Sequence, residues 1–173
     1  MSLKSVFVVT VLVTTLFVAV GSRAQQPNPL DVVPDKMPFD VAYGAPITLE
    51  RADAVLGAAL AEAKKHDWKL VCAVVDSGAN LVALKRMDGA QLASITVAPH
   101  KARTAAKYRR ETKVFEGGIQ QGNVYMLTLD DVIASRGGIP LVESGKLIGA
   151  IGCSGGTGSQ DEVAAKAGAA LIK

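Results

Sequence analysis

A glycine-rich turn is the first segment of this sequence whose residue types could do chemistry. It runs from Gly152 to Gly158 and includes Gly155 and Gly156. The free backbone amides of such a turn, followed by the positive end of a helix, favour a phosphate or a carboxylate. The P-loop and dinucleotide fingerprints do not match, because the turn has no Gly-Lys-Ser/Thr sequence and no parallel βαβ context. We therefore interpret the glycines first as residues that allow a tight turn, with an anion cradle as the alternative.

A second candidate lies at a predicted junction between a strand and a helix. Arg86, Met87, Asp88 and Gly89 place a guanidinium, a thioether and a carboxylate close together. Arginine suits a carboxylate ligand, which it can bind through two parallel hydrogen bonds. Together with Lys101 and the glycine turn, these groups could hold a small organic acid and exchange a proton with it. The alternative is an internal contact between Arg86 and Asp88 that only fixes the turn.

The sequence has two histidines, His66 and His100. His66 lies near the end of a predicted helix, where a cation favours the helix dipole, so a structural role is its default. His100 follows Pro99 in the first turn of a predicted helix and is expected near the surface. Neither histidine belongs to a His-Glu-x-x-His sequence, and the chain has no Cys-x-x-Cys-His sequence. We therefore expect neither a dedicated zinc site nor covalently attached haem.

The elements that must position these residues follow an apolar N-terminal segment. Residues 1–24 hold 15 hydrophobic side chains and only two charged ones, Lys4 and Arg23. A positive start, a short apolar run and small residues around Arg23 are typical of a cleaved export signal. The apolar run is shorter than the roughly 18–20 residues that a membrane-spanning helix needs. We therefore predict a periplasmic or secreted protein with no stable membrane anchor after cleavage; an uncleaved anchor is the alternative.

Cleavage after residue 24 leaves 149 residues, with 17 basic and 16 acidic side chains. This length suits one domain. Nucleic-acid binding needs a sizeable positive surface, which a formal charge of +1 does not supply. We therefore predict a single domain that does not bind nucleic acid.

Five of the seven prolines lie within residues 25–46. Proline at this density forbids a continuous helix or a central strand. We interpret this segment as an extended arm or linker, and as a loose leader rather than an arm that packs on a neighbouring subunit. The folded domain is expected over residues 47–173.

Hydrophobic patterning predicts most elements of the domain. Apolar residues at helical spacing predict a helix over residues 49–65, with Thr48 as its N-cap. Four β-rich runs separated by turn residues predict two hairpins. The predicted strands are residues 69–75, 81–86, 139–142 and 146–153.

Residues 90–110 have a helical composition that a proline interrupts. Because Pro99 would cost a helical hydrogen bond and clash with the preceding turn, we predict two helices, 90–97 and 99–110, with a kink as the alternative. The following segment is poorly patterned, and a short helix over residues 129–135 is the only element that it favours.

The order of the elements predicts the fold class. A final helix follows the glycine turn, with Ser159 and Glu162 at the spacing of a capping box. Strands that pair without obligatory crossovers predict an antiparallel sheet with helices on its face, an α+β domain. If the strands that carry Cys72 and Cys153 are neighbours, a disulfide between them is feasible; buried free thiols are the alternative.

Several short sequences occur in a specific order along the domain. They are Ala73–Asp76, Gly78, Leu81–Leu84, Arg86–Ala90, Ser94, Lys101-Ala102, Thr104-Ala105, Gly137–Pro140, Gly149–Gly152, Ser154–Gly156 and Asp161. This set resembles the GlcG/HbpS-like haem-binding family, which is related to the C-terminal domain of PduO-type corrinoid adenosyltransferases. The resemblance covers residues 48–173 and implies an α+β domain with a five-stranded antiparallel sheet and flanking helices, in a profilin/PAS-like layout. It also implies homo-oligomers, often tetramers or octamers, and some family members are exported and bind haem.

The resemblance also implies where a ligand binds. Transferred onto this sequence, the rim of the site consists of Arg86, Met87, Asp88, Gly89, Lys101, Thr104, Gly155, Gly156 and Asp161. Haem needs an apolar slot, an axial donor and cations for its propionates. Lys101 or Arg103 could bind the propionates. The candidate axial and metal ligands are His66, His100 and Thr104, with Met87 as a fourth.

The aromatic content bears on where haem could bind. Only six aromatic side chains remain after residue 24, too few to enclose a porphyrin within one monomer, so a site at a subunit contact is expected. The leading hypothesis is an exported haem-binding protein that captures, stores or senses haem, and that is a binding protein more than an enzyme. One alternative is an enzyme of lyase or isomerase type that acts on a small organic acid through Arg86, Asp88 and Lys101. Another is an oligomer with a purely structural or partner-binding role.

Overall fold

The computed structural model describes residues 32–173, so the predicted export segment and the beginning of the predicted arm lie outside the described residues. Residues 36–173 form one unit. Within the described range, no helix is both long enough and apolar enough to cross a membrane. The unit contains the whole predicted domain and the end of the arm that leads into it.

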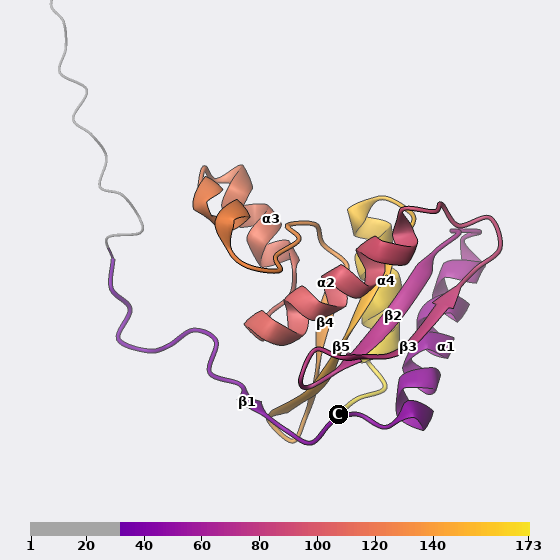
Figure 1. Cartoon of the computed structure of the whole chain (residues 1–173), viewed down its shortest axis with the longest axis horizontal. Helices are drawn as coiled ribbons and strands as arrows, with labels where there is room; N and C mark the ends of the chain where they lie inside the picture. Colours follow the sequence, from indigo (N-terminus) through magenta and orange to yellow (C-terminus); the bar gives the residue numbers. More distant parts are fainter. Residues whose placement is uncertain (1–31) are drawn as a thin grey trace, which may run out of the picture. The chain divides into compact units, whose positions relative to one another are not determined.

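A five-stranded sheet lies at the centre of the domain (Figure 1). The antiparallel strands are β4 (Gly138–Glu143), β5 (Lys146–Ser154), β2 (Val71–Asp76) and β3 (Leu81–Arg86), paired in that order. β1 (Ala42–Tyr43) pairs with β5 in parallel. Both predicted hairpins and the α+β class are confirmed. The sheet is mixed rather than wholly antiparallel, because the end of the arm adds β1.

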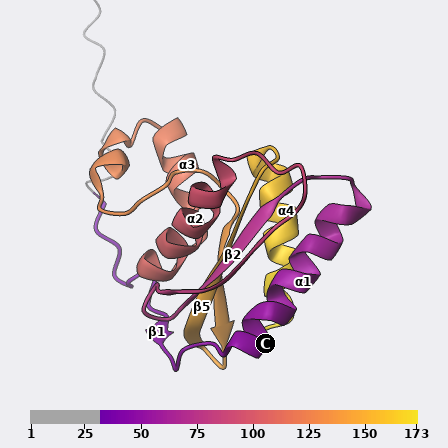
Figure 2. The same cartoon turned by 45° about the vertical axis from the view of Figure 1, so that its right-hand side comes forward.

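Helices cover both faces of this sheet (Figures 1 and 2). α1 (Leu49–Lys65) and α4 (Gly158–Ala169) pack on one face, and α2 (Ser94–Tyr108) packs on the other. Successive side chains of a strand point to opposite faces, so β2 serves both layers. Cys72 and Val74 pack with α1 and α4, whereas Val71, Ala73 and Val75 pack on the side of α2.

α2 crosses β5 at a glycine. A Cβ on Gly152 would overlap the carbonyl oxygen of Ala98 and would lie 2.5 Å from the amide nitrogen of Ala102. Both atoms belong to the backbone of α2, so a larger residue would push the helix away from the sheet. We expect Gly152→Ala to lower the free energy of unfolding by about 1–3 kcal/mol in urea denaturation.

The matched control for this substitution is Gly57→Ala in α1. An added Cβ at Gly57 meets no atom within 4 Å. Alanine in place of an exposed helical glycine should raise the free energy of unfolding by about 0.5–1 kcal/mol. Equal effects of the two substitutions would contradict the close approach of α2 to β5.

α1 begins at its predicted N-cap, because the Thr48 hydroxyl accepts a hydrogen bond from the Arg51 amide. α2, by contrast, is one continuous helix with Pro99 inside it, so the predicted division into two helices is wrong. Pro99 removes one backbone hydrogen bond. The burial of Ala98 and Ala102 against the sheet offsets this loss, since tertiary packing supplies most of the stability of a helix.

The segment after α2 differs from the prediction. Within the described residues, 129–135 form no helix. A helix, α3 (Lys113–Gln120), and a short 3-10 helix, η2 (Val124–Thr128), form before it instead. The two glycines in α3 and its short length hide its helical pattern in the sequence.

α4 begins two residues earlier than the predicted capping box implies. Thr157 and Gln160 form the box, rather than Ser159 and Glu162. Both pairs have the same spacing, so the local sequence does not choose between them. The Glu162 carboxylate is bound elsewhere, to Lys166 at 2.5 Å.

The end of the arm is anchored to the domain. The Tyr43 hydroxyl donates a hydrogen bond to the Lys107 carbonyl at 2.8 Å. The Arg110 guanidinium lies over the Phe39 ring, 3.4 Å from the ring centre. Phe39 and Tyr43, at the end of the predicted arm, therefore contact the domain instead of belonging to a loose leader.

Candidate functional site

The strand register brings several predicted site residues to one end of the sheet. Val71, at the start of β2, pairs with Arg86 on one side and with Ser154 on the other. The turn that begins at Arg86 and the glycine turn that follows Ser154 therefore leave the sheet at the same end. α2 starts there as well, since the Ser94 hydroxyl lies 3.0 Å from that of Ser154.

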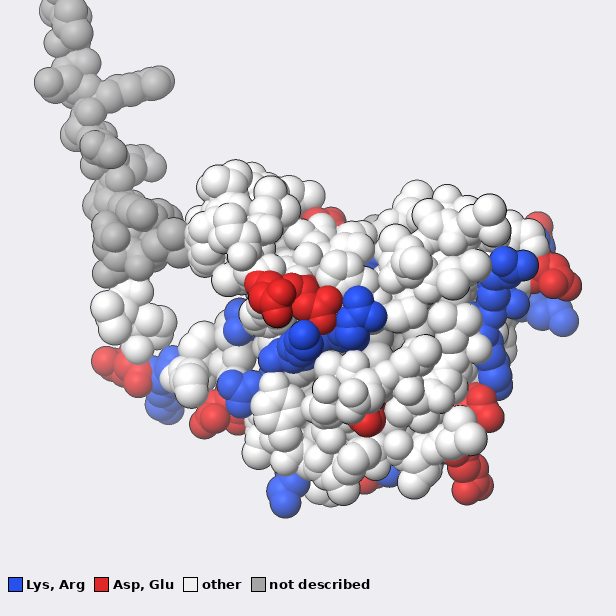
Figure 3. Space-filling model, viewed as in Figure 1, with Lys and Arg blue, Asp and Glu red and all other residues white. Residues whose placement is uncertain are grey.

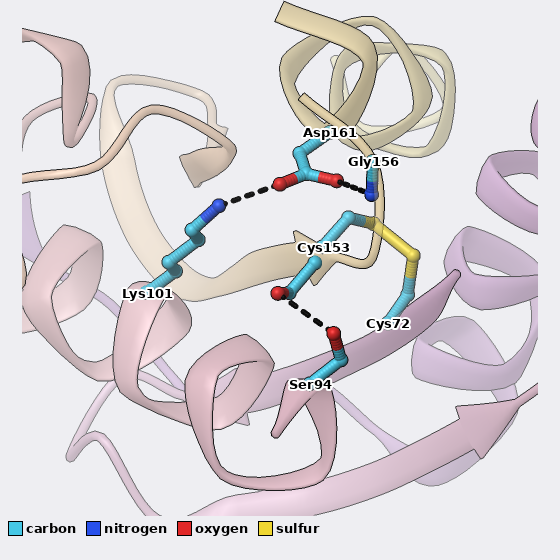
Figure 4. Close-up of a disulfide and its surroundings, with 7 residues drawn as sticks. Cys72, Ser94, Lys101, Cys153, Gly156 and Asp161 are labelled. Atoms are coloured by element: carbon cyan, nitrogen blue, oxygen red, sulfur yellow. Dashed lines mark hydrogen bonds and ion pairs between the residues drawn. A yellow bond between two sulfur atoms is a disulfide. The ribbon is translucent and has the colours of Figure 1, made fainter. Parts of the chain in front are cut away.

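A buried ion pair joins α2 and α4 next to the glycine turn (Figure 4). Lys101 of α2 donates to Asp161 of α4 at 2.8 Å, and the two side chains are only 2% and 4% exposed. The Gly156 amide donates to the other oxygen of Asp161 at 3.0 Å. Burial raises the pKa of Asp161, and the ion pair with Lys101 opposes that rise. Lys101 is thus held inside the domain rather than presented to a ligand.

The amides of the glycine turn are bound to side chains of the turn itself and of α4. The Gly156 amide binds Asp161, and the Thr157 amide binds the Gln160 side chain at 2.8 Å. The Gln160 amide in turn binds the Thr157 hydroxyl. These contacts match the structural interpretation of the turn, because they occupy two of the amides that an anion would bind.

The turn at the end of β3 is at the surface. Arg86 and Asp88 are exposed, and no ion pair joins them in the described part of the chain. The predicted internal contact is therefore absent here. Met87 packs against the buried cluster that α1 and α4 share, on the face of the sheet opposite α2. The structure thus does not bring the Met87 thioether together with His100 or Thr104.

His66 has a structural position at the end of α1. Its ring stacks on Trp68, with ring centres 4.4 Å apart, and it lies 3.4 Å from the Glu62 carboxylate. Its backbone amide also caps the helix. These contacts agree with the default expectation for this histidine.

Three cationic or ionisable side chains of α2 surround one carboxylate. Asp131 lies 2.8 Å from the Lys107 ammonium, 3.2 Å from Arg103 Nε and 3.2 Å from His100 Nε2. Figure 3 shows basic and acidic side chains adjoining over α2. Burial alone would raise the pKa of Asp131, but the contacts with Lys107 and Arg103 hold it below its ordinary value. Hydrogen bonding to Asp131 also raises the pKa of Lys107.

The His100 ring makes no aligned hydrogen bond in the described part of the chain. Its Nε2 atom is buried and close to Asp131, but the geometry is not that of a hydrogen bond. Thr104, one turn further along α2, is fully buried, and its hydroxyl makes two hydrogen bonds. Its hydroxyl donates to the Asp131 carbonyl at 2.9 Å and accepts from the Ile133 amide at 3.0 Å. Among the candidate ligands His66, His100 and Thr104, His100 is therefore the one whose side chain makes no hydrogen bond within the described residues.

Residues 32–173 contain no group of three histidine, cysteine or carboxylate side chains that could hold a metal ion, and they enclose no pocket. The α2 surface, defined here as His100, Arg103, Lys107 and Thr104 with the overlying Asp131, is the best-equipped site for an anion.

A family model described as "Haem degrading protein HbpS-like" matches residues 47–170. The chain belongs to this HbpS-like family. Protein GlcG of Escherichia coli K12 is 40% identical over 108 residues, which are 62% of this chain and 81% of GlcG. An uncharacterized 15.0 kDa protein of Citrobacter freundii, from the dhaT-dhaS intergenic region, is 36% identical over 126 residues, 70% of this chain and 89% of that protein.

Solved structures agree with the HbpS-like assignment. A double mutant of HbpS from Streptomyces reticuli has a TM-score of 0.70 at 28% identity, covering 84% of this chain and 99% of that one. A PduOC:heme complex has a TM-score of 0.68 at 28% identity, covering 75% and 96%. The predicted family and fold are therefore confirmed.

This HbpS-like domain has a disulfide that links its two central strands. Cys72 and Cys153 are direct partners in the β2–β5 register, and their sulfur atoms are bonded to each other. The disulfide that the sequence allowed is therefore present, and free thiols are not.

Two members of the α2 surface were missed by sequence reasoning. Lys107 had a detectable signal, because it follows His100 and Arg103 at the spacing of one helical face. Asp131 had none, since it lies in the poorly patterned segment and reaches α2 only through the tertiary fold.

Proposed function

We propose that this HbpS-like protein is an exported protein that binds haem non-covalently, for haem capture, storage or sensing. Its family description and the haem complex of a structural neighbour support the ligand. The N-terminal segment supports export, because its composition is that of a signal peptide. Within the structure, the proposal depends on the α2 surface, which has a nitrogen donor beside two cations.

The helical face that carries the α2 surface changes from apolar to cationic along the chain. Leu92, just before the helix, is 76% exposed, and Thr96 is exposed one turn later. His100 follows at the next turn, and Arg103 and Lys107 come after it on the same helical face. These residues would hold haem at this face, with Arg103 and Lys107 available to neutralise its propionates.

The axial donor and the cations that haem needs both have candidate residues on this surface. Haem supplies a redox-active iron when it is bound. The imidazole of His100 offers a nitrogen donor, and Arg103 and Lys107 neutralise carboxylates. The other candidates have different contacts: His66 stacks on Trp68, and the Thr104 hydroxyl is bound to backbone atoms.

We propose that a second copy of the chain supplies the apolar cover for a porphyrin. Residues 32–173 enclose no pocket. Leu92 and Ile95 are exposed near the start of α2, where a partner subunit could cover them. We therefore expect a homo-oligomer, a tetramer or an octamer, with haem at a subunit contact.

The organic-acid enzyme has less support. It needs the Lys101 ammonium beside Arg86 and Asp88, but that ammonium is buried against Asp161. The glycine turn that would hold the carboxylate is occupied by side chains of the chain.

Haemin titration of the mature protein tests the proposal. A saturable change of the Soret band is expected at micromolar haemin. His100→Ala should remove the spectral signature of a nitrogen ligand, and Arg103→Ala should weaken binding about fivefold to tenfold by leaving a propionate unpaired.

Lys85→Ala is the matched control for charge. Lys85 pairs with Asp53, away from α2, and its removal should leave haemin affinity unchanged. If wild-type protein showed no Soret change, haem binding would be refuted. If Arg103→Ala and Lys85→Ala behaved alike, the placement on α2 would be refuted.

A further inference from the structure

Residues 123–136 form a partly buried segment that lies over α2. None of these residues is fully buried, and after η2 they form no regular helix or strand. Backbone groups of the segment are held by two hydroxyls of α2. Thr104 binds Asp131 and Ile133, and the Tyr108 hydroxyl donates to the Asp130 carbonyl at 2.7 Å. At the end of the segment, Arg136 is bound to Glu116 of α3 rather than to α2. Segments without fully buried residues open at a lower free-energy cost than the core, so this one can leave α2 while Arg136 keeps that contact.

The Asp131 carboxylate is the main charged contact between this segment and α2. It lies within 3.2 Å of groups on His100, Arg103 and Lys107. All three belong to one face of α2, at intervals of three and four residues. Without Asp131, the remaining carboxylate of that segment would be Asp130, which acts on Lys107 but forms no ion pair with it in the described residues. An external carboxylate could take the place of Asp131 against the three groups.

Asp131 lies in a turn, and its backbone is in the left-handed region. Its φ is +53°, a conformation that aspartate adopts only occasionally. Its carboxylate and its carbonyl both point to α2, to the cations and to Thr104.

We propose that His100, Arg103 and Lys107 form a carboxylate-binding site, that Asp131 occupies it in the unliganded protein, and that an external carboxylate displaces residues 123–136. This inference rests on the proposed function where the carboxylate is a haem propionate. A small free carboxylate shares the same chemistry. Displacement also uncovers the Thr104 hydroxyl beside the bound group.

Competition by an internal group lowers the apparent affinity for a ligand. The observed dissociation constant is the intrinsic one divided by the fraction of protein whose site is open. Removing the charge of Asp131 should therefore strengthen the binding of any carboxylate that uses this site. Asparagine is the suitable replacement, because it keeps the shape and tolerates a left-handed backbone.

The experiment compares Asp131→Asn with Asp130→Asn in the full mature protein. Asp130 is the matched control, since it is the adjacent carboxylate and its side chain makes no ion pair within the described residues. We expect Asp131→Asn to bind haemin about tenfold more tightly than wild type, and Asp130→Asn to change affinity less than about twofold. Thermal unfolding checks that both variants are folded.

Two further probes identify the carboxylate. Haemin dimethyl ester lacks free propionates, so Asp131→Asn should bind it no more tightly than wild type does. Succinate tests a small free carboxylate at the same site. In wild-type protein, haemin should also speed hydrogen exchange of amides in residues 123–136, a measurement that needs no variant.

The outcomes separate this inference from the proposed function. If wild type binds haemin but Asp131→Asn binds it equally or more weakly, internal competition by Asp131 is wrong and haem binding stands. If neither form binds haemin but Asp131→Asn binds succinate, the carboxylate site stands and haem binding is wrong. If no probe binds to Asp131→Asn, or if exchange of residues 123–136 slows on haemin binding, the displacement is refuted.

Discussion

Asp161→Asn is expected to lower the free energy of unfolding by about 3–5 kcal/mol, because it leaves the Lys101 ammonium buried without a counter-charge. The wild-type pair is 2.8 Å apart, and neither side chain is more than 4% exposed. Asparagine keeps an oxygen for the Gly156 amide, so the loss reports the charge rather than the hydrogen bond. Urea denaturation at neutral pH measures the effect.

A surface pair provides the control for this substitution. Lys85 and Asp53 are 3.0 Å apart, but their side chains are 43% and 50% exposed. Solvent screens such a pair, so Asp53→Asn should cost at most about 1 kcal/mol. The double variant Lys101→Met/Asp161→Leu should recover most of the lost stability, because two apolar side chains leave no unpaired charge. Similar losses for Asp161→Asn and Asp53→Asn would disprove the role of burial.

The second large effect is expected from the disulfide. Cys72 and Cys153 are separated by 81 positions in the sequence. Cross-linking a loop of this length restricts the unfolded chain by about 4–5 kcal/mol in the loop-entropy model. We therefore expect Cys72→Ala/Cys153→Ala to lose about that much stability in urea denaturation.

Wild-type protein in excess dithiothreitol is the matching control. Reduction removes the cross-link but keeps both sulfur atoms in the core, so a similar loss in the two samples assigns the effect to the cross-link. A much larger loss in the alanine variant would instead assign it to core packing. Protein that retains full stability after complete reduction would contradict the prediction.

Local patterns in the sequence were sufficient for most of the elements. Thr48 marks the start of α1 because a cap acts through a residue three positions away. The strands that carry Cys72 and Cys153 were predicted because β-rich runs between turn residues depend on neighbouring side chains. Patterning failed at Pro99, where packing on the sheet outweighs the loss of one hydrogen bond.

The site was predicted less completely. Lys101 was expected to bind a ligand, but whether a lysine lies at the surface depends on what covers it. Asp161 covers it here, 60 residues away in the chain. The partners of His100 and Arg103 were not predicted either, because Asp131 belongs to a segment without a hydrophobic pattern.

The sequence by itself determined the family, the α+β class and the types and limits of most elements, because capping, turn chemistry and hydrophobic period are local properties. Only the tertiary structure decided which charged groups meet. Lys101 is buried against Asp161, and Asp131 lies on His100, Arg103 and Lys107, because the sheet order and the crossing of α2 bring distant segments together. Charge contacts between such segments have no local signature, and they are the contacts on which the proposed haem site depends.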